Sequence, residues 1–389
     1  MTNHVLAAAT NATTNLAILE LGLVFVGLGL LSWLALKLHI SAVPLFLLAG
    51  LSLGKGGIAP LELSEDFLNL GAEIGALLLL LVMGFEYSAN ELVTTLRSKW
   101  SIGLVDLAIN ALPAAVIALI LGYGPIGAVA FAGIMFVSSS GIASQLIRES
   151  GWAKSNIAKR ATSILVFEDI VLAPYLPILA AVTLGLSALG GLISVGIALA
   201  VTLVVFFIGM GREIPGLKSL AQSGPGPLLL LTFGVALAIS AGANIAGFSG
   251  VIAAFLFGLL LTGEVAESLR SRFAPLRDVF SAVFFLFFGL SIAAVDVFSV
   301  LPIALLFSVV GVAGKFFVGW LMGRDLQDPL AWRRIGAFLS SRGEFSMIIA
   351  ATVASALPVG VREVTLGVVV LTSLFSTLAI RAFRSRFEA

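Results

Sequence analysis

The chain has 389 residues, of which 59% are hydrophobic and 11% are charged, and its formal net charge is +1. This composition is far from that of a soluble globular domain. The complete absence of cysteine excludes disulfides, thiol chemistry and cysteine-ligated metals. No run of lysine or arginine indicates a nucleic-acid partner, and His4 and His39 do not suggest a transition-metal site.

Apolar segments follow one another from about residue 16 to residue 380, and many have the roughly 18 residues needed to cross a bilayer. We predict an all-α polytopic membrane protein with about thirteen transmembrane helices. Residues 1–389 would form one transmembrane domain in contact with membrane lipid, without a soluble domain. The predicted spans are 16–37, 41–54, 67–87, 101–122, 125–148, 156–183, 187–210, 226–242, 247–263, 276–295, 299–323, 331–355 and 360–380.

Positive charge is distributed unevenly between alternate connections of these spans. If the N-terminus is outside, nearly all of the 22 lysines and arginines fall in cytoplasmic segments. The outer loops then hold only Lys55 and Arg362, while Lys315 and Arg342 lie inside spans. Because cytoplasmic loops carry the excess of positive charge, we expect the N-terminus out and the C-terminus in. The expected location is a bacterial or archaeal inner membrane.

The second half of the chain repeats motifs of the first half in the same order, roughly 205 residues later. The matching spans are separated by seven, an odd number, so they would cross the membrane in opposite directions. Such inverted repeats, here about 41–183 and 247–380, are typical of secondary transporters. The matching segments are LLVMGFEYSA (80–89) with FLFFGLSIAA (285–294), FLLAGLSLG (46–54) with AFLFGLLLTG (254–263), and VSSSGIAS (137–144) with LSSRGEFS (339–346).

Four polar side chains from four spans are expected at the membrane midplane. Asp169 and Lys315 each lie nine residues from the nearest cytoplasmic arginine, roughly 14 Å at the helical rise of about 1.5 Å per residue. Half of a hydrocarbon core about 30 Å thick is about the same depth. Ser139 and Arg342 reach a similar depth. Charge at this depth is costly and indicates function, and repeat-built transporters bind their substrates there.

Two serine- and glycine-rich segments, SSSG (138–141) and SSRG (340–343), predict a pair of crossing broken helices. Membranes tolerate such breaks only inside protein or around a cavity. Arg342 and Glu344 would then neutralise the helix ends that meet there. The alternative is a continuous helix whose serines bond to the preceding turn. The serines assigned to this region are Ser138, Ser139 and Ser140 in the first segment, with Ser340 and Ser341 as accessory residues in the second.

Glu168 and Asp169 are adjacent carboxylates in the apolar stretch SILVFEDIVLAPYLPIL (163–179). They point about 100° apart on a helix, so one can face a substrate cavity while the other meets a partner. Pro174 and Pro177 remove backbone donors and free two carbonyls, which with a carboxylate make a hard-oxygen site for an alkali cation. Desolvation also favours the protonated, neutral form of a carboxyl group. A group that binds either a proton or a cation is the chemical core of an antiporter.

Lys315 is the natural counter-charge of this acidic pair and is expected to contact Glu168 or Asp169. The alternative interpretation is a purely structural ion pair that holds two helices together. Among the other acids, Glu73 is an accessory candidate, Asp106 is expected to be shallow with a helix-end role, and Glu86 is expected to be solvated.

These residues resemble the second large family of the monovalent cation:proton antiporter superfamily, which includes potassium-efflux and bacterial sodium/proton antiporters. The segment GAEIGALLLLLVMGFE (71–86) is similar to its third-span pattern, and the two serine-rich segments are similar to its crossing broken helices. FEDI (167–170) resembles its ion-binding motif, and Lys315 occupies its membrane lysine position. The resemblance implies a homodimer with a scaffold and a mobile core that carries Asp169 across the membrane. Glu168 departs from the Asp, Asn or Gln of the known subfamilies.

The sequence therefore predicts a transporter rather than an enzyme, without a cofactor, that exchanges K⁺ or Na⁺ for H⁺ at Asp169. The context of FEDIVLAPYLPIL (167–179) favours K⁺ slightly. A separate regulatory subunit could replace the nucleotide-binding domain of the potassium group. Two alternatives are a cation channel and a Na⁺-coupled symporter of an organic anion, in which Arg342 and Lys315 would bind the substrate.

Overall fold

The structure of the chain is a computed structural model. It describes residues 2–38, 40–54, 56–58, 65–85, 89–152, 154–183, 225–245, 249–261, 263–357 and 360–383, together with residues 196, 200 and 204. Nearly all of the predicted span 187–210 lies outside these residues, as do Lys55 and Glu86.

Within the described ranges the chain is α-helical and contains no strand. The expectation of an all-α membrane protein is confirmed, since eight of the described helices are long and apolar enough to cross a membrane. The helices are α1 (Thr2–Leu38), α2 (Val43–Leu53), α3 (Glu65–Gly84), α4 (Ala89–Ile120), α5 (Gly124–Phe136), α6 (Ser140–Glu149), α7 (Asn156–Thr183), α10 (Pro225–Ile245), α11 (Gly250–Leu260), α12 (Gly263–Leu290), α13 (Ala294–Gly323), α14 (Ala331–Ser340), α15 (Glu344–Val353) and α16 (Val361–Ala382).

Two helices begin well before the spans predicted for them. Helix α4 begins at Ala89 rather than near residue 101, and α12 begins at Gly263 rather than near residue 276. Both extensions contain charged residues, at which a hydropathy pattern ends a span. A helix satisfies its own backbone hydrogen bonds, so it can continue past the apolar segment.

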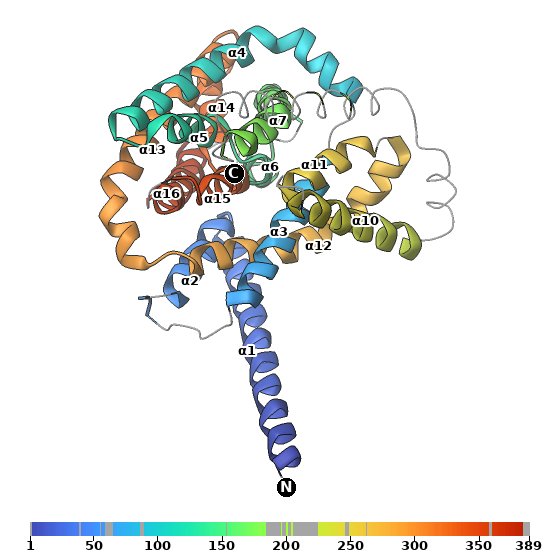
Figure 1. Ribbon diagram of the computed structural model, residues 1–389. Coiled ribbons are helices and arrows are strands. Elements are labelled where there is room, and N and C mark those ends of the chain that lie inside the picture. The colour runs from blue at the N-terminus through green and yellow to red at the C-terminus, as the bar shows by residue number, and fades with distance from the viewer. Residues whose placement is uncertain are drawn as a thin grey trace.

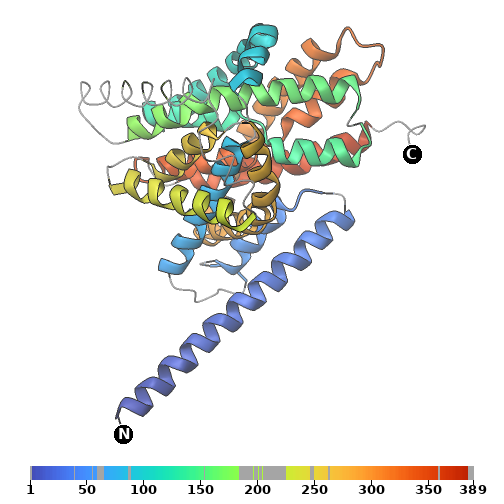
Figure 2. The same ribbon diagram turned by 90° about the vertical axis from the view of Figure 1, so that its right-hand side faces the viewer.

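The helices form two packed groups (Figure 1). In one group, α3 packs on α11 and α12, and α12 also packs on α2. The other group contains α4, α5, α7 and α13 to α16, and the short helix α6 packs on its α7, α14 and α16. Helix α1 contacts α2 and extends away from both groups, as Figure 2 shows from the side. The prediction of a scaffold and a core is compatible with this division.

Glycines allow the helices of the first group to approach at backbone distance. A Cβ on Gly50 of α2 would lie 2.1 Å from the carbonyl oxygen of Leu286 and 2.9 Å from the Cα of Gly289 on α12. A Cβ on Gly84 of α3 would lie 2.7 Å from the Cα of Gly258 on α11. Small residues at such contacts are the usual means of close packing between membrane helices.

The second group is packed mainly through aliphatic and aromatic side chains. Phe131 of α5 stacks on Phe307 of α13, with ring centroids 4.4 Å apart. Both rings are fully buried, and they belong to the main apolar cluster, which also includes Met347 of α15. This packing fixes the position of α5 relative to α13 and therefore of the polar residues that follow.

Candidate functional site: charges at two crossing helix breaks

Both serine-rich segments interrupt their helices. The chain is extended at Val137 after α5 and at Ser341 after α14, and helix resumes at Ser140 and at Glu344. The two breaks lie against each other, because the backbone N–H of Ser139 donates to the carbonyl oxygen of Ser341 at 2.8 Å. The broken-helix prediction is confirmed, and a continuous helix is excluded at both segments.

Two cations lie at the C-terminal ends of the interrupted helices, where backbone carbonyls lack helical donors. Arg342 donates from Nη1 to the carbonyl oxygen of Leu339 at 3.1 Å and from Nη2 to that of Met135 at 2.6 Å. Lys315 donates from Nζ to the carbonyl oxygen of Phe136 at 2.7 Å. Arg342 therefore contacts the ends of both α5 and α14, and its charge opposes the negative ends of two helix dipoles.

One acid lies on the opposite side of the breaks, where a helix begins. Glu344 is the first residue of α15 and accepts a hydrogen bond from Ser139 Oγ at 2.8 Å. Ser139 Oγ in turn accepts the backbone N–H of Ile142 at 3.2 Å, which caps the start of α6. The negative charge of Glu344 is thus placed at a positive helix end.

Glu168 contacts the first break directly. Its carboxylate accepts hydrogen bonds from the backbone N–H of Ser138 and, at 3.0 Å, from Ser138 Oγ. Ser138 Oγ also lies 2.7 Å from the carbonyl oxygen of Leu339, so its one hydroxyl proton is shared between the two acceptors. Glu168 on α7 is therefore connected through one serine to the ends of both α5 and α14.

Lys315 binds two carboxylates at once. Its Nζ lies 2.8 Å from Glu168 Oε1, and 2.7 Å and 3.0 Å from the two oxygens of Asp106. All three side chains are fully buried. Asn110, one turn further along α4, donates to Asp106 Oδ1 at 3.0 Å. The cluster joins α4, α7 and α13 by charge-assisted hydrogen bonds.

Asp169 follows Glu168 on α7 and is only 4% exposed. Adjacent helical residues point about 100° apart, so Asp169 faces a different side of α7 from the Lys315 cluster. The helix continues through Pro174 and Pro177 to Thr183. Pro174 leaves the carbonyl of Ile170, the residue after Asp169, without a helical donor, and Pro177 does the same to Ala173, one turn beyond Asp169.

The remaining predicted residues take different positions. Ser140 is the first residue of α6 and lines a cavity. Ser340 Oγ bonds back to the carbonyl oxygen of Gly336 at 2.7 Å, and buried Ser341 Oγ has no hydrogen-bond partner within the described part of the chain. Glu73 is exposed, and its carboxylate accepts a bond from Asn244 of α10 at 2.8 Å. The structure therefore places Glu73 in a contact between α3 and α10, apart from the cluster around Lys315.

Asp106 is the residue that sequence reasoning placed wrongly. It was expected to be shallow, but it is fully buried, and both of its carboxylate oxygens accept hydrogen bonds from Lys315. The error follows from the early start of α4, which puts Asp106 in the middle of a 32-residue helix. One signal was available, because Asp106 and Asn110 form a polar pair at i, i+4 spacing in an otherwise apolar segment.

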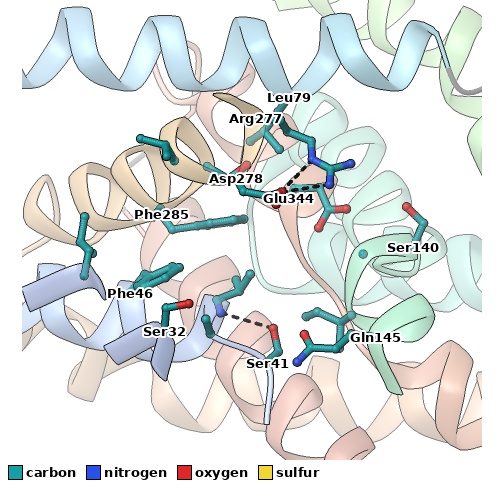
Figure 3. Close-up of a pocket in the computed structure, with 18 of the residues that line it drawn as sticks. Ser32, Ser41, Phe46, Leu79, Ser140, Gln145, Arg277, Asp278, Phe285 and Glu344 are labelled. Carbon is teal, nitrogen blue, oxygen red and sulfur yellow. Dashed lines mark hydrogen bonds and ion pairs between the residues drawn. The ribbon is translucent and has the colours of Figure 1, made fainter. Parts of the chain in front are cut away.

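A cavity of about 680 Å³ lies between the two helix groups. Helices α1, α2, α3 and α12 line one side, and α6 and α15 line the other. Figure 3 shows Ser140, Gln145 and Glu344 around the cavity, together with the ion pair between Arg277 and Asp278. The cavity lining reaches Ser140 but does not include Asp169 or Glu168.

Known proteins are similar to this chain over most of its length. The chain is 29% identical to the K(+)/H(+) antiporter subunit KhtU of Bacillus subtilis, over 86% of this chain and 85% of the relative. It is 28% identical to the ammonium/H(+) antiporter subunit AmhT of Alkalihalophilus pseudofirmus, over 86% of each.

The solved structure of the sodium proton antiporter MjNhaP1 from Methanocaldococcus jannaschii has the same fold, with a TM-score of 0.60 at 18% identity. The match covers 95% of this chain and 99% of that one. The model of the transmembrane sodium/hydrogen exchanger family matches residues 21–383. The chain therefore belongs to the sodium/hydrogen exchanger family of transmembrane proteins.

Proposed function

We propose that the protein exchanges a monovalent cation for H⁺ across the membrane, with Asp169 binding the cation or the proton in competition. The observation that carries the proposal is the pair of crossing helix breaks, whose ends are matched by Arg342, Lys315, Glu344 and Glu168. Such broken helices occur where transporters hold ions. Asp169 is the buried carboxylate that adjoins this arrangement on α7.

The chemistry of Asp169 suits both ligands. Carboxylate and carbonyl oxygens bind hard cations, and Pro174 frees a carbonyl beside the carboxylate. A carboxylate also takes up a proton and then becomes a neutral carboxyl group. Because a proton and a cation would neutralise the same charge, only one binds at a time, and the site crosses the membrane loaded with either. Ser138, Ser139 and Ser140 supply further oxygens near the break.

Alternating access requires the site to be open to one side at a time. The cavity between the helix groups reaches the start of α6 and the carboxylate of Glu344. We propose that the group containing α4 to α7 and α13 to α16 moves against the group containing α2, α3, α11 and α12. With the predicted orientation, the cavity opens to the cytoplasm, since Arg277 and Asp278 lie at the cytoplasmic end of their span.

Two helix contacts support the proposed inverted repeat, about 41–183 and 247–380. Gly50 of α2 packs on Gly289 of α12, and Gly84 of α3 packs on Gly258 of α11. The repeat relates α2 to α11 and α3 to α12, so an internal two-fold axis would exchange these two contacts. The order of helices, with one broken helix in each half, is the same in both repeats.

K⁺ is our preferred cation, with Na⁺ as the alternative. The name of the Bacillus subtilis relative, a K(+)/H(+) antiporter subunit, supports this choice. The word subunit in both relatives' names also supports a separate regulatory subunit. We further propose a homodimer in the inner membrane, with the N-terminus outside and the C-terminus in the cytoplasm, as the distribution of lysine and arginine indicates.

The test of the proposed function is dissipation of a pH gradient in proteoliposomes that contain the full chain. K⁺, Na⁺, Li⁺ or Rb⁺ is added outside while the membrane potential is clamped. We expect proton movement in the opposite direction to the cation, strongest with K⁺. Uptake of cation without proton movement would contradict exchange, and unitary currents would indicate a channel instead.

A further inference from the structure

Asp106 is a fully buried acid on α4 that the mechanism above does not use. Its two carboxylate oxygens lie 2.7 Å and 3.0 Å from Lys315 Nζ. Asn110, one turn along α4, contacts the same residue. Its Nδ2 donates to Asp106 Oδ1 at 3.0 Å and to the Asp106 carbonyl oxygen at 2.9 Å. Asp106 is therefore bound on both sides by residues of α4 and α13.

Lys315 has three N–H donors, and three groups accept from them. These are the Asp106 carboxylate, the Glu168 carboxylate and the carbonyl oxygen of Phe136. The ammonium group is fully buried, where an unpaired charge is very costly. Its position is therefore set by the acceptors that neutralise it.

The cluster contains two carboxylates for one ammonium. Loss of the Glu168 charge would leave Lys315 paired with Asp106 through both oxygens. Loss of the Asp106 charge would leave Lys315 with Glu168 alone, one residue from Asp169 on α7. Asp169 is then the neighbouring carboxylate on α7, and a buried ammonium that has lost one counter-charge attracts nearby carboxylates, because charges in a low-dielectric interior interact strongly.

We propose that Asp106 is a positioning residue that holds Lys315 toward α4 and so keeps the ammonium from competing with the cation at Asp169. The idea rests on the proposed exchange at Asp169. The two carboxylates that contact Lys315 then have different roles. Asp106 supplies the permanent counter-charge of Lys315, and Glu168 links Lys315 to the first helix break.

The test compares cation titrations in proteoliposomes. For Asp106→Asn we expect KM for K⁺ to rise about tenfold or more while kcat at saturating K⁺ stays within about threefold, because lost ground-state binding raises KM alone. Asp106→Glu keeps the charge and should restore most of the affinity. The matched control is Asp296→Asn, an acid in the first turn of α13, which should leave both constants unchanged.

The double variant Asp106→Asn/Lys315→Gln removes the competing ammonium together with its partner. We expect it to fold and to have a KM close to that of the wild type. The proposal is overturned if the folded Asp106→Asn variant has the wild-type KM, or if the double variant has the raised KM of the single one. If Asp106→Asn does not fold, the proposal is tested by the other two variants. A KM well above that of the wild type in the double variant or in Asp106→Glu overturns it.

A second readout does not depend on transport. The thermal stability of the detergent-solubilised wild type, of Asp106→Asn, of Lys315→Gln and of the double variant gives the coupling between Asp106 and Lys315. We expect the double variant to lose less stability than the sum of the single losses. Absence of coupling contradicts the role of Asp106, whereas a wild type that shows no exchange contradicts the proposed function.

Discussion

Lys315 and Glu168 form a buried ion pair that joins α13 to α7, with 2.8 Å between Nζ and Oε1. Because Glu168 also accepts hydrogen bonds from Ser138, the same carboxylate holds α7 against the first helix break. Asp169 is the next residue, so this pair fixes the rotation of α7 and with it the direction in which Asp169 points. On the proposed function, the two adjacent acids would have separate tasks, Glu168 in holding the helix and Asp169 in binding ions.

The Asp169→Asn variant should lose cation-dependent proton movement completely. Asparagine keeps the size of the side chain, but its amide group neither carries a negative charge nor takes up a proton. The measurement is pH-gradient dissipation in proteoliposomes on addition of K⁺ or Na⁺, with Asp296→Asn as the control. Retained exchange in a folded Asp169→Asn protein would refute the assignment of the ion site.

The Glu168→Gln variant should keep part of its exchange, with an altered stoichiometry or pH profile. Glutamine can still accept hydrogen bonds from Ser138 through its amide oxygen, and Lys315 keeps Asp106 as a counter-charge. The reversal potential of exchange under a set of imposed voltages measures the stoichiometry. A well-folded but inactive Glu168→Gln protein, beside an active Asp169→Asn protein, would show that the two roles are exchanged.

Most of the helices could be predicted because apolar length and charge position report membrane spans directly. The two breaks were also predictable, since Ser138 to Gly141 and Ser340 to Gly343 combine weak helix formers at mid-span. The depth of Asp106 could not be obtained in this way. Depth was measured from the nearest charge, and the charged residues before Asp106 belong to an extension of the same helix.

The partners within the site depend on how helices pack, which the sequence does not state. Lys315 was expected to pair with Glu168 or Asp169, and the structure places it on Glu168 and Asp106. The choice follows from the contact between α4 and α13, where Gly314 lies close to Asn110. A glycine next to the lysine lets α4 approach, and that approach brings Asp106 within reach.

The Arg342→Met variant should be much less stable than the wild type. Its guanidinium is fully buried and donates to carbonyls at the ends of both α5 and α14. Each buried carbonyl left without a donor costs about 1–3 kcal/mol. The midpoint of thermal aggregation in detergent measures the loss. Arg333→Met is the control, because Arg333 is exposed and stacks on Trp332; equal losses in the two variants would show that the bonds of Arg342 do not stabilise the crossing.

The Gly50→Ala variant should disturb the contact between α2 and α12. The added Cβ would lie 2.1 Å from the carbonyl oxygen of Leu286, so one helix backbone must move, and such overpacking typically costs about 1–3 kcal/mol. Gly27→Ala on α1 is the matched control, since nothing lies within 4 Å of its added Cβ. We expect a lower thermal midpoint for Gly50→Ala and an unchanged or slightly higher one for Gly27→Ala, where alanine favours helix. Equal midpoints for the two variants would contradict the backbone contact between α2 and α12, and with it one of the two contacts that support the proposed repeat.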